Sequence, residues 1–213
     1  MVNFLFVLSG VCWTLVYISL IYRGFKDKTY GMPLFALGLN IAWEVLYSID
    51  GIFIHKANMP PVQNVANVVW AFFDILIVIT FFRYGKKYFP EIGKKYFLPF
   101  GTLAIFTCVA LQLAFYLHFD SGVEASQYSA FAQNAAMSIM FLYMLFQRKG
   151  TEGQSFTVAI AKCLGTLAPT ILGGFIESTN MYIMLTGMVC LVFDIFYIIG
   201  LFQKNKTSKV AVF

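Results

Sequence analysis

The sequence predicts an all-α fold, an integral membrane bundle of seven transmembrane helices. Of its 213 residues, 60% are hydrophobic and only 12% are charged, whereas about 25% of the residues of soluble proteins are charged. A helix needs ~20 mostly apolar residues to cross a bilayer, and runs this long are helical because lipid leaves no partner for free backbone groups. The expected spans are roughly residues 3–22, 32–54, 62–82, 97–118, 126–147, 156–177 and 181–202.

The connections between these spans are short. The longest runs from Arg83 to Tyr96, which is 14 residues and leaves no room for a soluble domain. We therefore expect residues 1–213 to form a single transmembrane domain.

Positive charge is concentrated in alternate connections. The first, third and fifth connections and the C-terminal tail hold thirteen of the fifteen Lys and Arg residues. Because cytoplasmic segments carry the excess of Lys and Arg, the N-terminus is predicted outside and the C-terminus cytoplasmic. The net charge of +5 needs no nucleic-acid partner, since acidic membrane lipids suffice. No pattern indicates an oligomeric state. The cations in question are Arg23, Lys26, Lys28, Arg83, Lys86, Lys87, Lys94, Lys95, Arg148, Lys149, Lys204, Lys206 and Lys209.

Spans three and seven share a short sequence echo. Residues 72–79 read FFDILIVI and residues 192–199 read VFDIFYII. Such an echo favours two parallel three-helix repeats joined by a single span, an arrangement that some transporters use. Coincidence between two Phe- and Ile-rich helices is the alternative, and spans two and six show no matching sequence.

Carboxylates lie in the middle of several spans. Each costs about 2.5–3.5 kcal/mol at the bilayer centre, so it is expected to face the bundle interior. Helical spacing then shows which residues share its face. The resulting polar stripes are Asn40 and Glu44 in span two, Trp70 and Asp74 in span three, Asn134 and Ser138 in span five, and Asp194 and Tyr197 in span seven.

Interhelical hydrogen bonding is the alternative reading of these stripes, and we prefer it for Asn134 and Ser138. Lys162 is the only cation within a span. It lies about one turn inside the cytoplasmic end, where it could extend to the interface. No deep cation is then left for the acids, so at least one carboxyl is expected to be protonated at neutral pH and to serve as a Brønsted acid.

The three tryptophans, Trp13, Trp43 and Trp70, lie near span centres and not in the interfacial belts where tryptophan is usual. An aromatic-lined cavity would explain this depth, and aromatic faces stabilise cations. Ordinary packing is the alternative in a chain with 24 Phe and 12 Tyr. The sequence has no Gly-rich phosphate loop, no zinc-type Cys/His spacing and no Asp-rich magnesium box, so neither a metal nor a cofactor is expected.

The segment Asn-Ile-Ala-Trp-Glu at 40–44, a lone Asp194 in the last span, seven spans and a length just above 200 together resemble the transmembrane terpene cyclases. These are small enzymes of fungal meroterpenoid and indole-diterpene pathways, with relatives in bacterial indolosesquiterpene pathways. The resemblance implies that an epoxide or alkene of a prenylated substrate is protonated and cyclised through carbocations without metal. It also implies that Glu44 and Asp194 form the catalytic pair, and we expect Glu44 to be the acid.

The resemblance further implies a lipophilic prenylated substrate and a multi-pass protein of the bacterial cytoplasmic membrane or the endoplasmic reticulum. Asp50 and Glu177 lie near the outer face, so their amide variants are expected to stay partly active. The candidate substrate-binding residues are Trp43, Asn40, Trp70, Asp74, Tyr197, Trp13 and Asn134.

A small seven-span transporter, of the sugar type or proton-coupled, is the alternative function. The sequence echo favours it. Against it, the proline tetrad of sugar carriers is missing, since only Pro169 lies near a span centre. Three acids with three tryptophans would also make an unusual sugar site.

Overall fold

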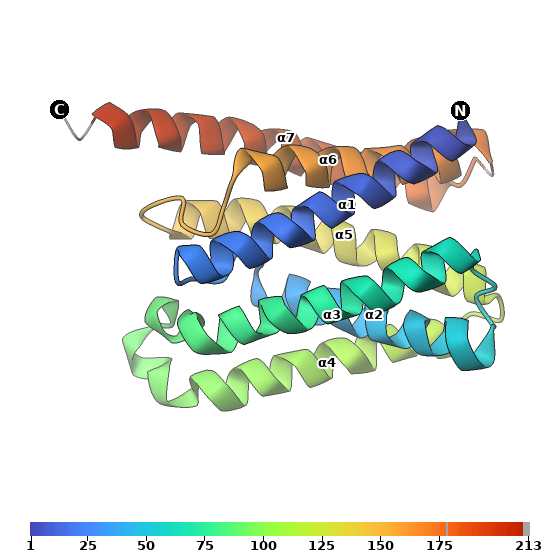
Figure 1. Ribbon diagram of the computed structural model, residues 1–213, viewed down its shortest axis with the longest axis horizontal. Coiled ribbons are helices and arrows are strands. Elements are labelled where there is room, and N and C mark those ends of the chain that lie inside the picture. The colour runs from blue at the N-terminus through green and yellow to red at the C-terminus, as the bar shows by residue number, and fades with distance from the viewer. Residues whose placement is uncertain (178, 211–213) are drawn as a thin grey trace.

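The computed structural model describes residues 1–177 and 179–210, with side chains described as far as residue 206. Seven helices long and apolar enough to cross a membrane form one bundle (Figure 1), and the described part of the chain contains no strand. The predicted all-α membrane class is therefore confirmed. The helices are α1 (Val2–Lys26), α2 (Leu34–Ile49), α3 (Pro61–Tyr84), α4 (Phe97–His118), α5 (Gly122–Gln147), α6 (Phe156–Ile171) and α7 (Met181–Val210).

Several helix boundaries differ from the predicted ones, and the largest difference is at the end of α7, which continues past the predicted 202 to Val210. The connection predicted over 83–96 is largely helical, since α3 continues into it and two 3₁₀-helices, η2 (Gly85–Tyr88) and η3 (Glu91–Tyr96), follow on either side of Phe89 and Pro90. Helix α5 begins at Gly122, ahead of the predicted 126, because the Ser121 side chain accepts a hydrogen bond from the Glu124 backbone N–H at 3.3 Å and caps the helix.

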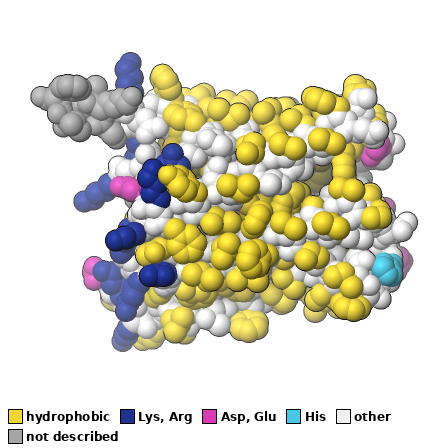
Figure 2. All heavy atoms as spheres, in the orientation of Figure 1, with side chains coloured by type: hydrophobic (Ala, Val, Ile, Leu, Met, Phe, Trp, Pro, Cys, Tyr) yellow, Lys and Arg dark blue, Asp and Glu magenta, His cyan; other side chains and the backbone are white. Residues whose placement is uncertain are grey.

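Helices α1, α3, α5 and α7 run in one direction and the other three run back (Figure 1). Lysine and arginine side chains gather at the end of the bundle where the chain finishes, and the surface between the two ends is largely apolar (Figure 2). The side chain of Lys209 lies outside the described residues. This charge distribution is the one on which the predicted orientation rests, and the orientation itself stays a prediction.

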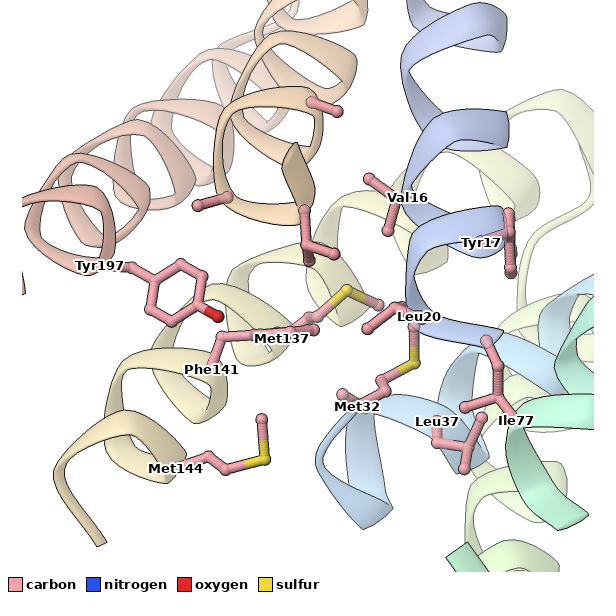
Figure 3. Packing of buried hydrophobic residues seen from close by; sticks show 14 of the residues in the cluster. Val16, Tyr17, Leu20, Met32, Leu37, Ile77, Met137, Phe141, Met144 and Tyr197 are labelled. Carbon is pink, nitrogen blue, oxygen red and sulfur yellow. The ribbon is translucent and has the colours of Figure 1, made fainter. Parts of the chain in front are cut away.

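The main hydrophobic cluster takes side chains from all seven helices. Leu20, Met32 and Met137 are fully buried and meet near its centre, with Phe141 beside them (Figure 3). Lipid gives helices no hydrophobic reason to associate, so close packing and interhelical hydrogen bonds hold such a bundle together.

The helices also form two similar units. Helix α3 packs against α1 and α2, and α7 packs in the same way against α5 and α6, with α4 between the units along the chain. Helices α2 and α6 both have 16 residues, and each continues into a five-residue π-helix: η1 (Asp50–Ile54) and η4 (Leu172–Ile176). The sequence echo between spans three and seven is thus matched by a structural similarity between α2 and α6, two helices whose sequences are not alike.

Candidate active site

A cavity of about 380 Å³ lies among α1, α2, α3, α5 and α6, closed at one end by the connection 55–60. This volume falls within the range of ligand-binding pockets. On the face drawn in Figure 2, the surface is hollowed between α1 and α3. The structure brings most of the predicted site residues to this cavity, namely Trp13, Asn40, Trp43, Glu44, Trp70 and Asn134.

All three tryptophans line the cavity, and two have their indole N–H groups satisfied by the protein. Trp43 donates to the Ser126 carbonyl at 3.1 Å and Trp70 donates to the Thr14 hydroxyl at 3.2 Å. These hydrogen bonds hold the rings in fixed positions without using their π-faces. The predicted aromatic-lined cavity is thus present in the structure.

Glu44 is buried at the cavity wall, and its two carboxyl oxygens have different surroundings. The Tyr17 hydroxyl donates to Oε1 at 3.2 Å. The Asn40 amide donates to that hydroxyl at 2.5 Å and to Asp74 Oδ2 at 2.8 Å. Gln133 in turn donates to Asn40 Oδ1 at 3.4 Å. Glu44 Oε2 has no hydrogen-bond partner in the described part of the chain.

The network contains two carboxyls, Glu44 and Asp74, and among the described residues neither forms an ion pair with a lysine or arginine. A carboxyl buried without a cation favours its neutral form. Asn40 and Tyr17 are themselves neutral donors, so this network supplies no positive charge to balance an ionised carboxyl.

Asp194 has a different environment. Its Oδ1 lies 2.7 Å from Lys162 Nζ, both side chains are buried, and the same ammonium donates to the Ser138 hydroxyl at 2.5 Å. The expectation that Lys162 extends to the membrane interface, leaving no deep cation, is therefore wrong. Lys162 points between α5 and α7, and the carboxylate and hydroxyl there replace the water it would otherwise seek.

Three predicted site residues do not line the cavity. Asp74 lies behind Asn40 and connects to Glu44 only through Asn40 and Tyr17. Asp194 and Tyr197 lie on a face of α7 that packs against α5 and α6, and the fully buried Tyr197 ring makes an edge contact with Phe141 at 5.6 Å between centroids. Of the two predicted catalytic carboxyls, only Glu44 reaches the cavity.

The sequence analysis did not single out Tyr17 or Gln133. Tyr17 lies four residues after Trp13, so both are on one face of α1, and this spacing was the available signal. Gln133 precedes the predicted Asn134 and donates to the Glu44 network, while its own Oε1 accepts from Gln112 at 2.7 Å.

Asp50 shapes the connection that closes the cavity. Its carboxylate accepts hydrogen bonds from the backbone N–H groups of Lys56 (3.1 Å) and Ala57 (2.9 Å) and from the Tyr116 hydroxyl (2.6 Å). Ala57 and the residues to Pro60 line the cavity. Asp50 therefore supports the wall from behind, and Glu177 is exposed near the end of α6. Among the residues that the structure describes, no group of three or more His, Cys, Asp or Glu side chains is placed to hold a metal ion.

Comparison with known proteins finds one family and several curated relatives. The model of the Pyr4-like transmembrane terpene cyclases matches residues 1–207. The Pyr4-family terpene cyclase mfmH of Annulohypoxylon moriforme is 31% identical over 76% of this chain and 66% of its own length. Terpene cyclase andB of Emericella variicolor is 31% identical over 85% of this chain and 73% of its own length. Terpene cyclase pyr4 of Aspergillus fumigatus is 23% identical over 93% of this chain and 84% of its own length.

The chain thus spans about two thirds of the length of mfmH and about three quarters of that of andB. No solved structure matches it.

Proposed function

The chain belongs to the Pyr4-like transmembrane terpene cyclase family, and on this premise we propose that it cyclises a prenylated substrate by acid initiation, without metal. The observation that carries the proposal is the placement of Glu44, which lies in an aromatic-lined cavity with Oε1 held and Oε2 unpartnered. A neutral carboxyl in such a place is a proton donor.

The proposed reaction begins at Glu44 Oε2. Its O–H bond breaks, and the proton adds to the terminal alkene carbon or the epoxide oxygen of the substrate, leaving a carbocation that the next double bond attacks. Trp13, Trp43 and Trp70 line the cavity in which the positive charge would form, and desolvated cation–π contacts are worth about 2 kcal/mol or more each. The final cation then loses a proton to water or to the Glu44 carboxylate, and Glu44 regains its proton directly or from water, so the acid is restored and product and substrate are isomers.

In this proposal Asp74 acts behind the acid. It accepts from Asn40, which also donates to Tyr17, and Tyr17 donates to Glu44 Oε1. The chain of donors fixes the rotamer of Glu44 and leaves Oε2 as the oxygen that carries the proton. Asp194 makes no contact with the cavity, so the acid role is given to Glu44 alone.

The substrate class follows from the surroundings of the site. The cavity is lined mainly by apolar and aromatic groups, and the hollow between α1 and α3 faces the apolar belt, so a lipophilic prenylated molecule could enter from the bilayer. Because the similar curated proteins are fungal, we place the chain in the endoplasmic reticulum, and these relatives give no support to the bacterial-membrane alternative.

A transporter is the second candidate, and the two similar three-helix units are the observation that favours it. Inverted or parallel repeats with a central site are common in carriers. The family match favours the cyclase, so transport is kept as the outcome against which the test discriminates.

The test uses membranes containing the full chain and a panel of epoxidised and plain prenylated aromatics. Chromatography with mass spectrometry should find a product of unchanged mass and shifted retention. Glu44→Gln should lower its rate of formation by about a thousandfold, because the amide has no acidic proton to give. The Glu44→Gln protein should still insert and fold.

Asp50→Asn is the matched control, since it removes another buried carboxyl that supports the wall without donating into the cavity. It should remain partly active. Turnover by Glu44→Gln at the wild-type rate would contradict the proposal. Uptake of the panel into vesicles without any isomer would favour the carrier.

A further inference from the structure

We propose that Ser138, Lys162 and Asp194 form a second copy of the triad Tyr17, Asn40 and Asp74, and that Asp194 is a positioning residue which acts through Lys162. The role given to Asp194 rests on the proposed function, because its activity measurements need cyclase turnover. It gives a role to Asp194, a buried carboxylate that does not line the cavity.

The two triads correspond in place along the chain. Their members are separated by 121 residues (Tyr17 and Ser138), 122 residues (Asn40 and Lys162) and 120 residues (Asp74 and Asp194). Each triad takes its first member from the first helix of a unit, its second from the helix that ends in a π-helix, and its third from the last helix.

The hydrogen bonds correspond as well. In the first triad the Asn40 nitrogen donates to the Tyr17 hydroxyl at 2.5 Å and to Asp74 at 2.8 Å. In the second, the Lys162 nitrogen donates to the Ser138 hydroxyl at 2.5 Å and to Asp194 at 2.7 Å. In both, one central nitrogen bridges a hydroxyl and a carboxyl.

The central residue sets the charge of each triad. Asn40 is neutral, and among the described residues Glu44 and Asp74 have no ion pair, whereas Lys162 balances Asp194 as an ion pair. The residue 122 positions after Glu44 is Thr166, which has no carboxyl. The second triad therefore has neither an acid facing a cavity nor a need for a proton.

The second triad is nevertheless connected to the cavity wall. Ser138 donates to the carbonyl of Asn134, a cavity residue, at 3.0 Å. Three residues after Lys162, the Gly165 carbonyl accepts from Ser9 at 2.8 Å, and a Cβ at position 165 would lie only 3.1 Å from the Trp13 ring. The ion pair thus holds α5, α6 and α7 where they support Asn134 and Trp13.

The experiment compares broken and compensated pairs in the full chain. Asp194→Asn leaves the buried ammonium unpaired. We expect a melting temperature lower by about 5 °C or more, and a kcat/KM about tenfold lower because KM rises as the wall shifts. Lys162→Met combined with Asp194→Leu removes both charges. This double variant should regain the wild-type melting temperature, and its kcat/KM should lie within about threefold of wild type with the wild-type product ratio. The reason is that well-packed apolar residues can replace a buried ion pair.

Either of two results would overturn the proposal. The first is a compensated variant that melts like wild type but forms no product, which would show that the Asp194 carboxyl takes part in the chemistry. The second is failure to fold of both this variant and the exchanged pair, Lys162→Asp with Asp194→Lys, which would show that charge balance is not what the pair supplies. Melting temperatures need no substrate, so they test the pair even if the proposed cyclase activity fails in the wild-type protein.

Discussion

The two buried triads differ in what balances their carboxyls. Around Asp74 and Glu44 the partners are a neutral amide and a phenol, and the network opens on a cavity. Around Asp194 the partner is an ammonium, and the surroundings are packed side chains. One frame of three helices can thus surround a carboxyl either with a balancing cation or with neutral donors alone.

The largest expected effect comes from giving the first triad the charge of the second. Asn40→Lys would place an ammonium beside Asp74 and near Glu44, which favours the ionised acids. We expect turnover to fall by about a thousandfold, as for loss of a general acid. The protein should remain folded, because Asp74 can pair with the new ammonium. Product formation per folded molecule and thermal melting are the measurements.

Asn40→Met is the control, since the methionine side chain is similar in length to that of lysine but carries no charge. It removes the hydrogen bonds that Asn40 donates to Tyr17 and Asp74 and should lose activity, but less than Asn40→Lys. Equal losses in the two variants would show that hydrogen bonding, and not charge, distinguishes the triads.

A middle-sized effect is expected from the first members of the triads. Tyr17→Phe removes the hydroxyl that holds Glu44 Oε1, and turnover should fall by about tenfold, the usual cost of a lost hydrogen bond to a buried group. Ser138→Ala removes the corresponding hydroxyl in the second triad, where Lys162 keeps Asp194 as a partner, so its rate should change far less. The measurement is the initial rate of both variants on one substrate. A larger loss in Ser138→Ala than in Tyr17→Phe would contradict the assignment of the acid to the first triad and of positioning to the second.

The smallest effect concerns the cavity, which only the first triad faces. Gly10 lines it, and a Cβ there would meet no atom within 4 Å, so Gly10→Leu should fold normally and fill part of the space. We expect KM to rise about threefold for the longest prenyl chains and less for shorter ones. Val11→Leu, at a position that is 54% exposed on the outside, is the control. Chain-length preferences that are the same in both variants would argue against this cavity as the substrate site.

The seven helices could be predicted because bilayer thickness sets the length of each apolar run. The capped start of α5 at Ser121 and Gly122 was missed, since a cap is a local hydrogen bond that hydropathy does not register. The site was predicted best where two signals coincided. Asn40 and Glu44 share a helix face, and Trp13, Trp43 and Trp70 are unusually deep, and all of them line the cavity.

Periodicity tells which residues share a face but not which helix that face meets. For this reason Asp194 and Tyr197 were expected at the site, whereas their face of α7 packs against α5 and α6. The same limit applies to Lys162. Its depth could be estimated from the helix end, but its partners Ser138 and Asp194 come from helices distant in sequence.

The three tryptophans of the chain all line one cavity. Intrinsic indole fluorescence of the purified protein therefore originates entirely at this site, with no background from tryptophan elsewhere. A ligand that enters should change the emission wavelength or quench it, so occupancy can be titrated optically on the unlabelled protein, even with molecules that do not react.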